Sequence, residues 1–132
     1  MQNYEQLRAQ SALAYAHSNV PKGGKEGGEV VKKIPAMIIG NGLLAAAAFA
    51  FENAQERNQE NRGWAACFDH IARHLSSQEI GILKEADNVA RLIEELTESD
   101  SQTLKLATAE AMEWLGYARR FVVRERPGGR TR

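Results

Sequence analysis

Cys67, His70 and His74 are the residues whose types and spacing most directly suggest chemistry. Steps of three and four residues place them near one face of a helix, and thiolate and imidazole groups are common zinc ligands. A tetrahedral site needs a fourth ligand, and His17 has no spacing that recommends it. The three side chains also border an apolar stripe, where histidines are common without any metal. We therefore expect no metal ligand, and we keep a free-standing helical metal protein or enzyme built on these residues as an alternative.

Paired carboxylates are the second candidate for chemistry, because hydrolysis often uses two of them as general acid and base. Glu94 and Glu95 are adjacent, and Glu110 lies three residues before Glu113. The apolar face of the helix around Glu94 and Glu95 is already occupied by other residues, so we expect both carboxylates to point into solvent. No Ser, Thr or Cys has a base at a recognised motif spacing. The sequence predicts no catalytic residue, no cofactor and no small-molecule substrate.

Positive charge is grouped locally although Lys plus Arg and Asp plus Glu each number 17 in the whole chain. The basic residues gather before Pro35 and near the end of the last predicted helix: Lys22, Lys25, Lys32, Lys33, Arg119 and Arg120. The segment 124–132 adds four arginines and one glutamate, a side-chain charge of +3. Such clusters can neutralise the phosphates of a nucleic acid. Solvated surface charge, and a favourable position at a helix C-terminus, are the alternative explanation, and both stay open.

Helical periodicity positions these candidates. Two apolar stripes with steps of three and four residues predict long helices: Trp64, Phe68, Ile71 and Leu75, then Leu104, Thr108, Ala111, Leu115, Ala118 and Val122. Three pairs resemble capping boxes that open helices: Asn3 with Gln6, Ser76 with Glu79, and Ser99 with Gln102. No alternating apolar and polar run is bounded by turn signals, so a sheet is not expected. The prediction is an all-α fold, a compact bundle of five to seven helices.

The stretch from Ile34 to Phe51 approaches the length of a membrane span. Pro35 and the run Gly40-Asn41-Gly42 interrupt it, and its second half is mostly alanine. We expect two buried helices joined at a break, and no membrane partner.

Size and composition indicate one globular domain, since the 132 residues are 43% hydrophobic and 26% charged. We expect a helical bundle over residues 1–123 and a basic, flexible tail over 124–132. Cys67 is the single cysteine, and the N-terminus lacks the basic start and apolar core of a secretory signal. The cytoplasm is therefore the expected location.

Two blocks of the sequence occur in a fixed order and separation. The first is Lys32-Lys33-Ile34-Pro35-Ala36-Met37-Ile38-Ile39, followed by Asn41-Gly42-Leu43 and Ala48-Phe49. The second is Leu104-Lys105-Leu106-Ala107-Thr108-Ala109-Glu110-Ala111-Met112-Glu113-Trp114-Leu115, then Arg119-Arg120-Phe121. Together they resemble the small-subunit family of type III-B CRISPR RNA-silencing complexes, the Cmr complexes, over about Val30 to Val122. The apolar run Leu44 to Ala48 departs from the family, which often has more polar residues there.

The resemblance implies an all-helical scaffold subunit without nuclease activity, acting in antiviral defence. Its partners would be the other subunits of the type III-B complex, further copies of itself in a secondary filament, the guide RNA and the target RNA. Lys32, Lys33, Arg119 and Arg120 stand in the matching blocks and are expected to bind RNA, and Arg124 joins them on charge alone. A small subunit of the related type III-A complex is a further alternative.

Overall fold

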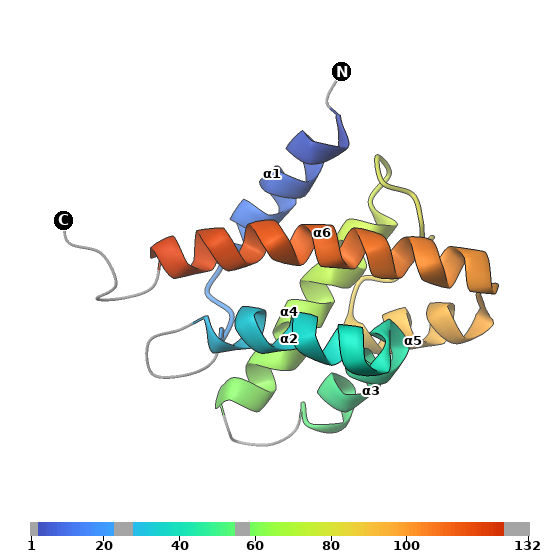
Figure 1. Cartoon of the computed structure of the whole chain (residues 1–132), viewed down its shortest axis with the longest axis horizontal. Helices are drawn as coiled ribbons and strands as arrows, with labels where there is room; N and C mark the ends of the chain where they lie inside the picture. The colour runs from blue at the N-terminus through green and yellow to red at the C-terminus, as the bar shows by residue number, and fades with distance from the viewer. Residues whose placement is uncertain (1–2, 23–27, 55–58, 126–132) are drawn as a thin grey trace.

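A computed structural model describes the backbone of residues 3–22, 28–54 and 59–125, and the side chains of all of these except 59–61 and 123–125. This part of the chain contains six helices and no strand (Figure 1). The helices are α1 (Tyr4–His17), α2 (Glu29–Asn41), α3 (Leu43–Glu52), α4 (Gln59–Ser76), α5 (Val89–Glu98) and α6 (Ser101–Glu125). The predicted all-α fold of five to seven helices is confirmed.

The longest helix, α6, runs along the length of the molecule, with α1 crossing it and α2 lying alongside it (Figure 1). Behind them α4 contacts all five other helices, and α5 packs against α3 and α4. The chain passes along α2 and α6 in opposite directions, so the start of α2 lies near the end of α6 (Figure 1). This arrangement brings the two basic segments of the sequence to the same end of the fold.

The hydrophobic core contains both apolar stripes that the sequence predicts. All four residues of the α4 stripe are buried, and so are the last four of the α6 stripe, from Ala111 to Val122. Trp114 and Tyr15 add the largest fully buried side chains and pack 5.3 Å apart between ring centroids. Because α4 and α6 each bury one face, their other faces are left to carry charge.

One of the three predicted capping boxes is confirmed and two are wrong. Asn3 caps α1, with its side chain accepting from the Gln6 N–H at 2.8 Å and its own N–H donating to Gln6 at 3.0 Å. Ser76 instead ends α4, and residues 77–88 form no helix. Ser99 ends α5, and the Asp100 carboxylate accepts from the Thr103 N–H at the start of α6.

Residues 77–88 are held by tertiary hydrogen bonds instead of helical ones. The Leu75 carbonyl accepts from the N–H groups of Ile82 and Leu83, which turns the chain back on α4. The Glu95 side chain accepts from the N–H groups of Lys84 and Glu85. In and just after this segment Ile82, Ala86 and Val89 recur at helical steps of four and three residues, which predicts a helix. The bonds to α4 and α5 satisfy its backbone in another way.

The apolar stretch from Ile34 to Phe51 consists of α2 and α3, which meet at Gly42. The expected break is confirmed, and α2 runs through Pro35. No helix among the described residues combines the length and the apolar character that crossing a membrane requires.

Candidate nucleic-acid interface

Lys32 and Lys33 are exposed because the rest of the first turns of α2 face inward. Val30, Val31 and Ile34 are all fully buried, so helical geometry turns the two intervening lysines outward. The start of α2 is tied down by the Lys22 carbonyl, which accepts from the N–H groups of Gly28 and Val30 at 3.1 and 3.2 Å. The lysines therefore project from a fixed helix end.

Arg119 and Arg120 are exposed in the last turns of α6 for the same reason. Ala118 and Val122 on either side are buried, which anchors this part of the helix to the core. Arg119 and Arg120 lie six and five residues before the end of α6 at Glu125, which is outside the last turn where the helix dipole acts.

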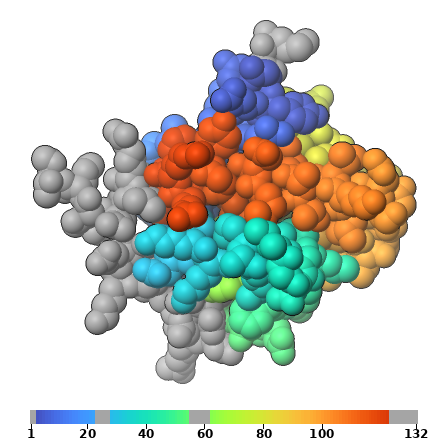
Figure 2. All heavy atoms as spheres, in the orientation of Figure 1, coloured from blue at the N-terminus to red at the C-terminus, as the bar shows by residue number. Residues whose placement is uncertain are grey.

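The two basic pairs lie at one end of the molecule. Gly28, just before α2, is so close to Val122 of α6 that a Cβ atom on Gly28 would lie 3.3 Å from Val122 Cγ1. Lys32 follows Gly28 by about 6 Å of helix, and Arg119 precedes Val122 by about 4.5 Å. Figure 2 shows the surfaces of the two segments meeting. We call Lys32, Lys33, Arg119 and Arg120 the basic end.

The other cations of the predicted clusters behave differently. Lys22 is half-buried: its Nζ donates to the carbonyls of Ser18 and Val20 and lies 5.4 Å from the centre of the Tyr15 ring. Its burial lowers the pKa of its ammonium group. Position 124 belongs to α6, but the Arg124 side chain lies outside the described residues, as do Lys25 and the segment 126–132.

Cys67, His70 and His74 do not converge on one point, although Cys67 and His70 both lie beside Tyr15. Cys67 lies in the core beside Tyr15, where burial raises the pKa of its thiol to about 12. The His70 ring packs edge-on against Tyr15 at 5.1 Å, and burial lowers its pKa to about 4. Within the described ranges no group of three or more His, Cys, Asp or Glu side chains is placed to hold a metal ion.

His74 belongs to a buried ion network that sequence reasoning missed. Its Nε2 lies 2.9 Å from Glu110 Oε2, and Arg8 donates two hydrogen bonds of 2.8 Å to the same carboxylate. Burial raises the pKa of Glu110, but the bonds from Arg8 and His74 outweigh it and hold this pKa below its ordinary value. For His74, burial lowers the pKa more than Glu110 raises it. The sequence signal that could have revealed this network is Glu110 itself, a carboxylate next to the buried Ala111 on α6.

The remaining carboxylates also have structural roles. Glu94 is exposed as expected and lies 3.3 Å from Arg91 Nε, whereas Glu95 is half-buried and binds the backbone at residues 84 and 85. The prediction that Glu95 points into solvent is therefore wrong. Glu113 is exposed, 4.0 Å from Arg8 Nη1.

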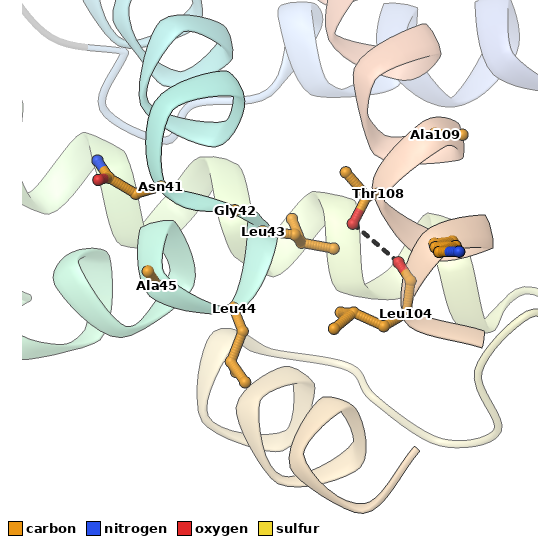
Figure 3. Close-up of a pocket in the computed structure, with 9 residues that line it drawn as sticks. Asn41, Gly42, Leu43, Leu44, Ala45, Leu104, Thr108 and Ala109 are labelled. Carbon is orange, nitrogen blue, oxygen red and sulfur yellow. Dashed lines mark hydrogen bonds between the residues drawn. The ribbon is translucent and has the colours of Figure 1, made fainter. Parts of the chain in front are cut away.

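An apolar groove of about 490 Å³ lies between the α2–α3 junction and the first turns of α6 (Figure 3). Leu43, Leu44 and Leu104 form its walls, and Thr108 donates back to the Leu104 carbonyl at 2.8 Å instead of reaching across. Leu106, 51% exposed, lines a separate pocket with Tyr4 and Arg8. Ile39, 77% exposed, lies two residues before the groove residue Asn41. The groove includes the start of the apolar run that departs from the resembled family.

Comparison with known proteins decides the family. The model of the CRISPR-associated protein family Cas_Cmr5 matches residues 4–125, from the first residue of α1 to the last of α6. The chain belongs to the Cmr5 family. No curated protein and no solved structure matches it.

Membership in the Cmr5 family identifies the chain as the small subunit of a type III-B CRISPR effector complex, which acts in antiviral defence. The family match itself removes the type III-A alternative. Because Cmr5 proteins are non-catalytic structural subunits, it removes the free-standing metal enzyme as well. Its partners include the other components of the Cmr complex. The family match covers all four residues of the basic end and stops before the segment 126–132.

Proposed function

We propose that the basic end of this Cmr5 subunit faces the guide RNA and target RNA of the complex. The observation that carries the proposal is the joining of two exposed basic pairs, 87 positions apart from Lys32 to Arg119, at the contact of Gly28 with Val122. Clustered Lys and Arg side chains bind phosphates and release counterions, which supplies affinity without reading bases. Base pairing between guide and target carries the sequence information.

Arg124 extends the proposed RNA surface. It follows Arg120 by four residues, a spacing that places both positions on one face of a helix. Positions 124 and 125 end α6, so we propose that only residues 126–132, with a side-chain charge of +3, act as a basic extension of the helical domain. An extension of this kind would add phosphate contacts that do not depend on the folded domain.

The charge distribution supports one orientation of the subunit on RNA. Residues 77–100 carry seven acidic and two basic side chains, a net charge of −5. They include α5 and lie at the start of α6, whereas the basic end lies at its other end (Figure 1). A polyanion attracts one end of such a molecule and repels the other. The acidic segment would therefore point away from the RNA.

We propose that further copies of the chain pack through the apolar groove and the exposed Ile39 side chain two residues before it. Apolar patches of this kind on a small subunit mark protein interfaces. The groove lies toward the end of α2, away from the basic end at its start, so one copy can contact RNA and a neighbour at once (Figures 1 and 3). The cytoplasm, where target RNA is available, is the proposed location.

Charge reversal tests the RNA proposal. Lys32→Glu combined with Arg119→Glu changes one cation of each pair, and Lys84→Glu combined with Arg91→Glu is a control with the same change in net charge at exposed positions outside both proposed surfaces. The test measures the affinity of the purified chain for a guide–target duplex against salt, and its co-purification with the other Cmr subunits. We expect the salt dependence to weaken in the first variant alone, with a slope smaller by about 0.7 to 0.9 for each phosphate that is no longer neutralised. An unchanged slope with an unchanged fold would contradict the proposal.

A further inference from the structure

Gly28 is buried where the start of α2 meets the end of α6, between the two basic pairs. We call the contact of Gly28 with Val122 the joint. It is the residue before α2, and its φ of +89° lies in the left-handed region that side chains rarely adopt. Its N–H donates to the Lys22 carbonyl, which also accepts from Val30. The backbone therefore enters α2 at one defined position and direction.

Val122 closes the other side of the joint. A Cβ atom on Gly28 would lie 3.3 Å from Val122 Cγ1, closer than ordinary van der Waals contact, and Val122 is itself buried. The β-branched Val122 side chain has few rotamers to move into, so a side chain at position 28 pushes Val122, and with it the end of α6, away from the start of α2 by a few tenths of an ångström. Glycine is the residue that permits this distance between the two helices.

We propose that Gly28 is a positioning residue for RNA binding, because its contact with Val122 sets the spacing between Lys32–Lys33 and Arg119–Arg120. This inference rests on the proposed function of the basic end. The phosphates of a guide–target duplex are held at a fixed spacing by the duplex itself, so cations on two helices bind together only when those helices are correctly offset. Gly28 touches no phosphate in this proposal and acts only through the two helix ends.

Three changes at the joint separate its contributions. Gly28→Ala introduces both the unfavourable φ and the close contact, and Gly28→Asn keeps the contact with a residue that tolerates positive φ better. Gly28→Ala combined with Val122→Ala removes the contacting Cγ1 atom while keeping the unfavourable φ. Glycines elsewhere supply matched controls: Gly40→Ala on α2 and Gly116→Ala on α6 meet nothing within 4 Å, and Gly42→Ala carries a φ of +95° without a close contact.

The readout is the salt dependence of affinity for a guide–target duplex, with circular dichroism and thermal unfolding on the same samples. A change that only destabilises the fold lowers the melting temperature and the active fraction but leaves the salt slope of the folded molecules unchanged. We expect Gly28→Ala and Gly28→Asn to reduce the slope by about 0.7 to 0.9 for each phosphate that the displaced cations no longer reach. The double variant should regain the parent slope, and the three control glycine variants should keep it.

Two results would overturn the inference. One is a parent-like slope in folded Gly28→Asn, and the other is a double variant that binds no better than Gly28→Ala. If the charge-reversal variant of the basic end shows a smaller slope while Gly28→Asn does not, the proposed RNA surface is supported and the proposed role of Gly28 is refuted. If neither variant shows a smaller slope, the proposed function itself has failed.

Discussion

One helix, α6, carries two groups of charges in opposite settings. Near its middle, Glu110 is enclosed with Arg8 and His74 in a network that joins α1, α4 and α6. At its end, Arg119 and Arg120 stand in solvent beside the start of α2. The two groups are about ten residues apart, or about 15 Å along the helix.

The difference between the groups teaches which charges stabilise this fold and which are available to a partner. Removing one member of a buried ion pair leaves an uncompensated charge, so the network contributes to stability through its completeness. Exposed cations contribute little to stability because water screens them. Substitutions in the two groups should therefore differ in their effect on unfolding, from large in the buried network to small at the basic end.

Glu110→Ala should produce the largest loss of stability. It leaves the guanidinium of Arg8 and the ring of His74 without their shared carboxylate, and we expect a loss of roughly 3–5 kcal/mol in the free energy of unfolding. Urea unfolding at neutral pH measures it. Glu113→Ala is the matched control on the same helix, since Glu113 is exposed and only 4.0 Å from Arg8, and it should change the free energy by less than about 1 kcal/mol. Similar losses of stability in Glu110→Ala and Glu113→Ala would show that the buried and the exposed carboxylate do not differ in their contribution to the fold.

Acidification should weaken the network before it affects the basic end. The folded state lowers the pKa of both His74 and Glu110, and the unfolded chain therefore binds protons more readily than the folded one. Stability should fall as pH drops below about 6.5, the ordinary value for histidine, and fall again below about 4.3, the ordinary value for glutamate. His70, with its pKa lowered to about 4, adds to the first decline.

Urea unfolding across this pH range checks the prediction. His70→Phe and His74→Phe should each flatten the first decline, and the second should remain in both. A free energy of unfolding that stays constant from about pH 7 to pH 5 would contradict the lowered pKa values of the two histidines.

The sequence predicts the helices better than it predicts what joins them. Trp64, Phe68, Ile71 and Leu75 share one face at any helical geometry, so local periodicity is sufficient for α4. Residues 77–88 also had helical spacing, but bonds from Leu75 and Glu95 fold them differently, and no local pattern contains those bonds. The partner of Glu110 is Arg8, 102 positions away, and its pairing depends on how α1 crosses α6.

The candidate site shows the same limit. Exposure of Lys32, Lys33, Arg119 and Arg120 follows from the periodicity of α2 and α6, and the sequence shows each basic pair directly. The two pairs lie side by side because Gly28 approaches Val122, and that contact is a property of tertiary packing. The separation of Cys67, His70 and His74 likewise depends on what packs around α4, because helical spacing alone would allow them to converge.

Ser11→Ala should have an intermediate effect on the free energy of unfolding, because the hydrogen bond that it breaks joins two uncharged groups. Trp114 Nε1 donates to Ser11 Oγ at 2.9 Å, so the change leaves a buried donor without its acceptor at a cost of about 1–3 kcal/mol. Ser101→Ala, at an exposed position, is the control and should stay within about 0.5 kcal/mol of the parent. Trp114→Phe removes the other partner, and the Ser11→Ala, Trp114→Phe pair should cost less than the sum of the single changes. Strict additivity would show that the bond contributes nothing.

Arg119→Gln combined with Arg120→Gln should have the smallest effect on unfolding and a clear effect on RNA. Both side chains are exposed, so we expect their loss to change the free energy of unfolding by no more than about 0.5 kcal/mol. The salt slope of duplex binding should fall nonetheless, because phosphate contacts depend on these charges and not on stability. Lys84→Gln combined with Lys105→Gln removes two exposed charges elsewhere and should leave the slope unchanged. If the arginine variant instead unfolds as readily as Glu110→Ala, the end of α6 is part of the structural core, and its cations are not available to RNA.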